Sequence, residues 1–314
     1  MPADTHTAPA HPAFIDALID RLDLRANSLI ITIFGDALMP RGGTAWLGSL
    51  IGLAACFGIS ERLVRTGVYR LAKEGWLVSR TRGRRSYYSL TPAGHDKFEE
   101  AQRRIYAAGP LPWDDNWRLV QILPDMSQAE RNVLRRELTL LGMGQVSPTL
   151  FAHPSADGRL IHRTLDELGL TTKVIALSAA MEDYVKGTTL RRLAREAWSL
   201  DALGRDYEAF EEHFREVPEL LEKTPGLTFR DHFTLRILLI HDYRRILLKD
   251  PQLPDDLLPA DWQGRHAREL CARIYRRVAG PAEGFIDAEV ETWDGAPPPA
   301  GEAFWRRFGG VPGG

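Results

Sequence analysis

The chain has 314 residues, of which 44% are hydrophobic and 26% are charged, and its formal net charge is −2. This composition is ordinary for a globular protein of roughly two or three domains, and it excludes collagen-like, low-complexity and disulfide-rich chains. The longest apolar run, Trp46 to Ile59, is shorter than a membrane span and contains glycine, so we expect no membrane segment.

The cysteine content and the first residues indicate a cytosolic protein. Cys56 and Cys271 lie far apart, and neither has the neighbouring thiols or histidines of a zinc site, so we expect both to be buried and reduced. The first fourteen residues have no basic segment before an apolar one, and we therefore expect a flexible tail rather than a secretory signal.

The first predicted elements are three helices separated by turns. Phe14 to Leu24 has the apolar spacing of a short amphipathic helix, which could serve as an arm for dimerisation. Ser28 to Met39 is rich in β-branched residues that favour a strand, but its place before a helix-turn-helix favours a buried helix. We expect Thr44 to cap a second helix that runs through Phe57 and ends at Gly58.

The segment from Gly58 to Leu90 predicts a helix followed by a hairpin, with Ser60 as the N-cap of the helix. The expected inward face consists of Leu63, Val64, Gly67, Val68 and Leu71. Trp76 to Arg80 and Ser86 to Leu90 are strand-like, and a glycine-centred tip at residues 81–85 joins them.

Basic charge is concentrated in this same segment. Residues 58–90 hold eight lysines or arginines and two glutamates, a net charge of +6, so the rest of the chain carries −8. A solvated helix face is the alternative reading, but this concentration favours nucleic-acid binding. The residues expected to contact DNA are Ser60, Glu61, Arg62, Arg65, Thr66, Arg70, Arg82, Arg84 and Arg85.

A small α/β domain is predicted after a linking helix capped by Thr91. Trp117 to Leu123 is a strand candidate, and Ser127 with Glu130 forms the capping box of the next helix. Two more extended stretches follow, at residues 146–152 and 173–177. Asp125 follows the first strand, but a lone carboxylate does not make a two-metal site.

The last part of the chain is predicted to be helical. The expected helices are residues 190–203, 207–217, 229–248 and 265–278, and the tryptophans among these domains are expected to be core residues. The final stretch is rich in proline and glycine, so we expect it to be frayed and to contribute nothing to a core.

A second group of polar residues lies on the predicted helix 229–248. His241 and Asp242, with His213 upstream and Asp255 or Asp256 downstream, are residue types that could bind a metal in a phosphohydrolase. They could equally be ordinary polar residues of an amphipathic helix. No glycine-rich or metal-binding string accompanies them, so we expect no catalytic or metal site.

Several motifs resemble the PaaX family of phenylacetate-degradation operon repressors. They are SLIITIFGDALMPRGGTAWLGSLIG, GISERLVRTGVYRLAKEGWLVSR, GRRSYYSLTPAG, LIHDYRRILLKD and LPDDLLPADWQG, and the resemblance covers residues 25–275. More distantly, the basic helix with EGWL is similar to GntR-type winged helices.

The resemblance implies an α+β, multidomain fold. The expected parts are a tail and arm helix over 1–24, a winged helix-turn-helix over 25–108, a ferredoxin-like middle domain over 110–182 that is similar to the CRISPR adaptor nuclease, a helical domain over 183–296, and a tail over 297–314.

The implied function is repression of a phenylacetate-type catabolic operon by a cytoplasmic homodimer on double-stranded DNA, released by an aryl-acetyl-coenzyme A effector such as phenylacetyl-coenzyme A. Candidate effector-binding residues are Arg191, Arg192, His241, Arg244 and Arg245. No cofactor is expected. The rival reading is a metal-dependent phosphohydrolase or nuclease fused to a DNA-binding module.

Overall fold

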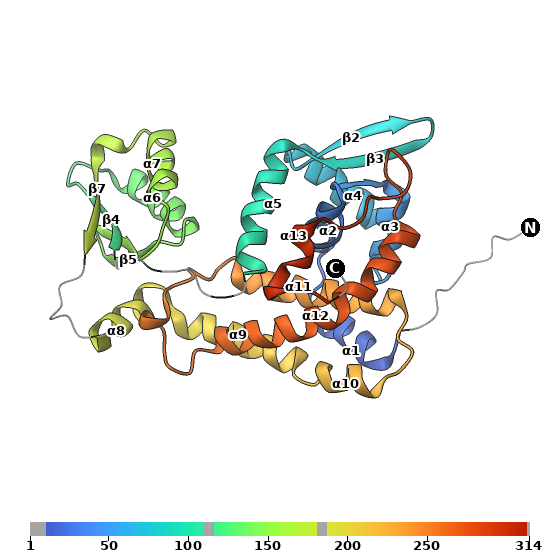
Figure 1. Cartoon of the computed structure of the whole chain (residues 1–314). Coiled ribbons are helices and arrows are strands. Elements are labelled where there is room, and N and C mark those ends of the chain that lie inside the picture. Colours follow the sequence, from blue (N-terminus) through green and yellow to red (C-terminus); the bar gives the residue numbers. More distant parts are fainter. Residues whose placement is uncertain (1–10, 108, 110–112, 114–115, 181–186, 313–314) are drawn as a thin grey trace, which may run out of the picture. The chain divides into compact units, whose positions relative to one another are not determined.

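The computed structural model describes residues 11–107, 109, 113, 116–180 and 187–312 (Figure 1). The chain forms two compact units: unit 1 comprises residues 1–108, 210–245 and 267–314, and unit 2 comprises residues 109–209 and 246–266. The boundary between them falls inside α9 (Leu200–Phe214), α11 (Phe229–Leu247) and α12 (Gln263–Glu289). The predicted α+β, multidomain class is therefore confirmed. None of the helices in the described ranges combines the length and apolar composition needed to cross a bilayer.

Unit 1 begins with α1 (Ala13–Arg21), which is packed rather than extended, since Ile15 is fully buried. The next segment is helical, as predicted, despite its β-branched residues. It consists of α2 (Ala26–Ile33), a π-helical turn (Phe34–Leu38) and a 3-10 turn (Met39–Arg41). Tertiary packing overrides strand propensity here, because Leu29, Ile30 and Ile33 are all buried.

A three-stranded antiparallel sheet of unit 1 contains one strand, β1, that was not predicted. The order is β1-β3-β2, with β1 at Thr44–Trp46, β2 at Leu77–Arg82 and β3 at Arg85–Leu90. Thr44 was expected to cap a helix and instead pairs with Ser89. The prediction was wrong because the partner that makes Thr44 a strand residue lies on a distant part of the chain.

Further helices of unit 1 are α3 (Leu47–Ala55), α4 (Glu61–Lys73), α5 (Pro92–Ile105), α10 (Val217–Lys223) and α13 (Glu302–Trp305). Helix α3 starts later than predicted, α4 and α5 start as predicted, and α10 and α13 were not predicted. As predicted, the Thr91 side chain caps α5 by accepting a hydrogen bond from the Gly94 amide. Cys56 and Cys271 are buried free thiols.

The C-terminal stretch is ordered and enters the core of unit 1, contrary to expectation. Phe304, Phe308 and Val311 are buried, and Phe308 contacts the rings of Tyr106 and Tyr275. The proline and glycine content misled the prediction because the few large side chains between those residues supply enough apolar surface to anchor the segment.

Unit 2 contains a four-stranded antiparallel sheet with the order β5-β6-β4-β7. The strands are β4 (Asn116–Ile122), β5 (Gly144–Ser147), β6 (Leu150–His153) and β7 (Val174–Ala180). The stretch predicted at residues 146–152 is thus part of a hairpin of two strands. Helices α6 (Gln128–Leu140) and α7 (Gly158–Glu167) cover one face, and Leu134 and Ile161 pack there on Val120 (Figure 1).

The capping box predicted at the start of α6 is present, since Ser127 and Glu130 bond reciprocally. The helix predicted over 190–203 is instead divided into α8 (Gly187–Ala197) and α9, which are separated at Ser199 by a positive φ of 49°. The helices predicted over 229–248 and 265–278 correspond to α11 and to a longer α12.

Candidate nucleic-acid interface

Helix α4 presents one face to the interior of unit 1 and the opposite face to solvent. Val64, Val68 and Leu71 are buried, and Gly67 lets α2 approach closely: a Cβ on residue 67 would lie 2.5 Å from Cδ1 of the buried Ile30. The charged face therefore cannot turn inward, and its side chains are held at the surface by the packing beneath them.

The residues predicted to contact DNA on and before α4 are all exposed: Ser60, Glu61, Arg62, Arg65, Thr66 and Arg70. Ser60 occupies the N-cap position with extended backbone, but its side chain makes no capping hydrogen bond, so that part of the prediction is wrong. Its hydroxyl is left at the surface.

Two of the arginines on this face pair with acids one turn away. Arg65 lies 2.7 Å from Glu61, and Arg70 lies 2.8 Å from Glu74. Both pairs are exposed and of the i,i+4 type, so they are weak and can be exchanged for phosphate contacts. Among the described residues Arg62 has no ion-pair partner within 4.0 Å, so its guanidinium is already available.

Leu63 of α4 is not the core residue that the apolar spacing predicted. It was expected in the core but is 42% exposed, and Tyr69 is 70% exposed on the same helix. The apolar spacing was misleading because Val64, Val68 and Leu71 already fill the contact with α2, and a wider stripe has nothing to pack against. The face of α4 thus offers apolar as well as charged groups.

The β2–β3 hairpin projects beside α4 and has a tighter tip than predicted (Figure 1). Arg82 pairs directly with Arg85, so only Gly83 and Arg84 form the turn, and Gly83 has a φ of +60°. Glycine is favoured in this conformation because it lacks a Cβ. The turn leaves the Arg84 side chain at the end of the hairpin.

The arginines on either side of the tip are held by the segment that follows α12. Arg85 Nη1 donates to both carboxylate oxygens of Glu291, at 2.5 and 2.6 Å. Arg82 Nη1 donates to the Trp293 carbonyl at 3.1 Å, and its guanidinium carbon lies 4.7 Å from the centre of the Trp293 ring. Arg84 has no such ion-pair partner within the described residues, so it is the available cation of the hairpin tip.

The predicted effector residues His241 and Arg244 are occupied within unit 1. Arg244 donates to Thr32 Oγ1 and to the carbonyl and hydroxyl of Ser28, each at 2.8 Å. Nδ1 of the buried His241 lies 3.0 Å from the same Thr32 oxygen. Both side chains thus fasten α11 to α2.

Burial sets the charges of these two side chains. It lowers the pKa of His241 to about 3, and the nearby Arg244 and Arg245 add to the effect, so His241 is neutral at physiological pH. Burial likewise lowers the pKa of Arg244 to about 10, which leaves the guanidinium charged.

The remaining predicted effector residues are exposed. Arg245 lies on α11 in unit 1, whereas Arg191 and Arg192 lie on α8 in unit 2. The five candidates therefore come from two separate units.

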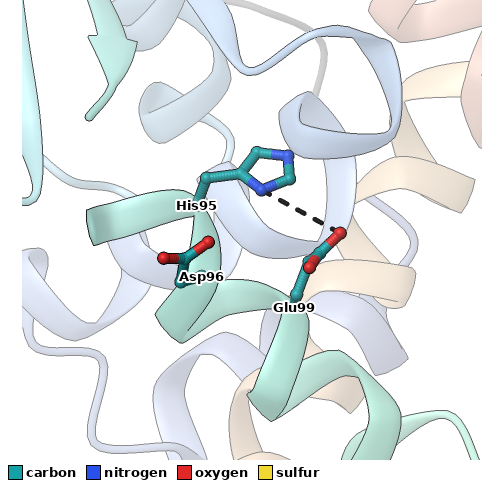
Figure 2. A group of neighbouring side chains, drawn as sticks. All are labelled: His95, Asp96 and Glu99. Atoms are coloured by element: carbon teal, nitrogen blue, oxygen red, sulfur yellow. Dashed lines mark ion pairs between the residues drawn. The ribbon is translucent and has the colours of Figure 1, made fainter. Parts of the chain in front are cut away.

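Few side chains in the described part of the chain could hold a metal ion. Asp242 pairs with His213, whose Nδ1 lies 2.8 Å from Asp242 Oδ2, rather than with the adjacent His241, and no third ligand joins the pair among the described residues. A group of three ligand types occurs on α5, where His95, Asp96 and Glu99 lie within 4.8 Å of one another (Figure 2). All three are exposed on one helical turn, which is unlike a resident metal site.

Asp125, considered as a metal ligand, is exposed after β4 and belongs to no such group within the described residues.

A buried polar cluster of unit 1 was not predicted. Asp36, in the π-helical turn, is 1% exposed, and Arg236 on α11 is fully buried. Arg236 Nε donates to Asp36 Oδ2 and its Nη1 donates to Glu283 Oε1, both at 2.5 Å. Arg307, from the C-terminal stretch, donates to the Asp36 carbonyl at 2.9 Å. These residues are distant in sequence, so no local sequence pattern predicts the cluster.

Comparison with known proteins identifies the family. The family model described as PaaX-like protein matches residues 25–94, that described as PaaX protein central Cas2-like domain matches 110–193, and that described as PaaX-like protein C-terminal domain matches 198–288. The chain is also 39% identical over 299 residues to the transcriptional repressor PaaX of Escherichia coli strain K12, covering 95% of this chain and 94% of that protein. The chain belongs to the PaaX family. This PaaX membership confirms the resemblance inferred from the motifs and the prediction that the chain is not an enzyme.

A solved structure shares the fold. The uncharacterized protein Rv0674 from Mycobacterium tuberculosis matches with a TM-score of 0.51 and 21% identity, covering 82% of this chain and 97% of that one. All nine predicted DNA-contacting residues lie inside the region that matches the PaaX-like model, whereas the ordered C-terminal stretch lies outside the three matched regions.

Proposed function

We propose that the protein is a sequence-specific DNA-binding repressor of a phenylacetate-type catabolic operon. The observation that carries the proposal is the exposed basic face of α4 beside an arginine-tipped hairpin, in a chain whose family includes a transcriptional repressor. Focused positive charge on an acidic protein supports binding to phosphates in one place, because the rest of the surface repels DNA.

The DNA-binding part is a winged helix-turn-helix in this proposal. Helices α3 and α4, joined at Gly58, supply the helix-turn-helix, and the β2–β3 hairpin supplies the wing. The first half of α4 enters the major groove, where Arg62 and Arg65 reach base edges or phosphates. Arg84 contacts the adjacent backbone from the wing.

The middle part of the chain is a ferredoxin-like domain in this proposal. The order β4-α6-β5-β6-α7-β7 is the β-α-β-β-α-β succession of that fold, and the match to a central Cas2-like model is in keeping with it. The domain carries no proposed catalytic role.

The active form is a cytoplasmic homodimer. One α4 helix reads only a few base pairs, so specific binding requires two copies on a near-palindrome with half-sites one or two helical turns apart. An aryl-acetyl-coenzyme A thioester, such as phenylacetyl-coenzyme A, releases the operator by favouring a different placement of the two helices.

The test is a gel shift or anisotropy titration on DNA from upstream of the protein's own gene, with and without a panel of acyl-coenzyme A thioesters. We expect a retarded complex in the absence of ligand and its loss with an aryl-acetyl thioester. If the protein bound this DNA specifically and no thioester released it, the proposed effector would be refuted. The rival phosphohydrolase or nuclease would be favoured if the protein bound this DNA no more tightly than an unrelated fragment and if the purified protein contained stoichiometric metal.

A further inference from the structure

A groove lies between α5 and the C-terminal stretch of unit 1. Its volume is about 460 Å³, and its walls include Gln102 and Arg103 from α5 and Arg306 and Arg307 from the turn that follows α13. This volume falls within the range of roughly 300–1,000 Å³ that is typical of small-molecule sites.

The charge of the groove suits an anion. Three arginines and one carboxylate, that of Glu99, line it, and one of the three, Arg307, is already paired with the buried Asp36 at 3.1 Å. Glu99 faces His95 at 4.0 Å, and Arg306 pairs with Glu302 on its own exposed helical turn. Arg103 is exposed and has no ion-pair partner within 4.0 Å among the described residues, so its charge is uncompensated at short range.

Arg307 gives the groove a fixed wall. Its guanidinium carbon lies 3.9 Å from the centre of the Tyr106 ring, and Nη1 donates to the Tyr275 hydroxyl at 2.7 Å. The side chain is only 3% exposed, yet its Nε has no acceptor within the described residues. A buried donor without an acceptor is costly, and a ligand oxygen could satisfy it.

We propose that this groove binds the phosphate groups of the effector, with Arg103 and Arg306 as the mobile cations and Arg307 as the preorganised one. The identity of the effector rests on the proposed function. Guanidinium groups bind phosphate through paired hydrogen bonds, and a rigid arginine loses less conformational entropy on binding than a free one.

The position of the groove connects it to the DNA-binding elements. Helix α5 follows β3 directly, and its capping residue Thr91 donates from its hydroxyl to the Gly75 carbonyl at 2.6 Å. Phe98 of α5 packs edge-on against Trp76, between α4 and β2, at a centroid distance of 5.6 Å. A ligand that draws the far end of α5 toward Arg307 therefore acts on the helix that anchors the hairpin.

The test uses the full chain with Arg103→Gln and Arg306→Gln combined, because both residues are exposed and lie outside the buried cluster. Arg21→Gln is the matched control, since Arg21 is an exposed arginine of α1 that does not line the groove. Calorimetry measures the binding of phenylacetyl-coenzyme A, coenzyme A and inorganic pyrophosphate. We expect the double variant to bind both coenzyme A compounds at least about tenfold more weakly while operator affinity without ligand stays within about twofold. Arg21→Gln should bind like the wild type.

The outcomes separate this proposal from the effector's identity. In one outcome, the wild type binds pyrophosphate but not the thioester, while the double variant no longer binds pyrophosphate. That result would support the groove as a phosphate-binding site and would refute the thioester as the effector. Wild-type affinity of the double variant for every ligand that the wild type binds would overturn the groove, as would loss of thioester binding in Arg245→Gln alone. Failure of the wild type to bind any of the three compounds would also overturn it.

Discussion

Replacing Asp36 by Asn should destabilise unit 1 by about 3–5 kcal/mol, the cost of breaking a buried ion pair by removing one partner's charge. Asp36 is 1% exposed and accepts from Arg236 Nε at 2.5 Å and from the Tyr106 hydroxyl at 2.6 Å. Burial by itself would lower the pKa of the Arg236 guanidinium, but Asp36, Tyr275 and Glu283 outweigh burial and hold that pKa well above its usual value. The variant leaves Arg236 with Glu283, which also pairs with the buried Arg41, and it removes the carboxylate that pairs with Arg307.

Urea denaturation followed by circular dichroism measures this loss. Asp96→Asn is the matched control, because Asp96 is exposed on α5 and its replacement should change the free energy of unfolding by no more than about 0.5 kcal/mol. A loss below about 1 kcal/mol for Asp36→Asn would refute the view that its charge balances the buried arginines.

Two further predictions concern the helices around this cluster. Gly94→Ala should lower the free energy of unfolding by about 1–3 kcal/mol despite the better helix propensity of Ala, because the new Cβ would lie 2.4 Å from the Trp76 carbonyl oxygen. Gly52→Ala is the control, since its Cβ would meet only a Glu289 oxygen, at 3.4 Å. Equal urea midpoints for the two variants would contradict the prediction. His241 has a folded pKa of about 3, below its ordinary 6.5, so the unfolded state binds the extra proton and stability should fall as the pH drops from about 6.5 toward 3. His241→Asn should weaken that pH dependence in urea titrations at pH 7.5 and 5.5, and an identical dependence in both proteins would count against it.

Local patterns were enough to predict the elements whose signals lie close together in sequence. The spacing of Val64, Val68 and Leu71 identified α4, and Ser127 with Glu130 identified the start of α6. The exposed basic face could be predicted because charged residues on a packed helix must point away from the packing.

The elements that were missed depend on partners far along the chain. Thr44 becomes a strand residue only through Ser89, and a three-residue strand has no period of its own to detect. Arg307 enters the core through Tyr106 and Tyr275, and Phe304 through Arg236 on α11, which composition near the C-terminus could not reveal. The groove unites Arg103 with Arg306 in the same way.

The contacts around the hairpin distinguish arginines that are free to bind phosphate from arginines that already have a partner. The sequence gives no reason to separate Arg82, Arg84 and Arg85, whereas the structure holds two of them against Glu291 and Trp293. Composition shows only the number of charges, whereas an arginine that is already paired with a carboxylate gains less binding free energy from a contact with phosphate.

The most direct test of DNA binding through α4 and the hairpin is the salt dependence of operator affinity for the wild type, Arg84→Ala and Arg85→Ala. Each phosphate contact contributes about 0.9 to the slope of log affinity against log salt concentration. We expect Arg84→Ala to weaken binding and to reduce the slope by about 0.9, and Arg85→Ala to have a smaller effect because Glu291 already pairs with Arg85. Unchanged affinity and slope for Arg84→Ala, and likewise for Arg65→Ala on α4, would contradict this account of the interface.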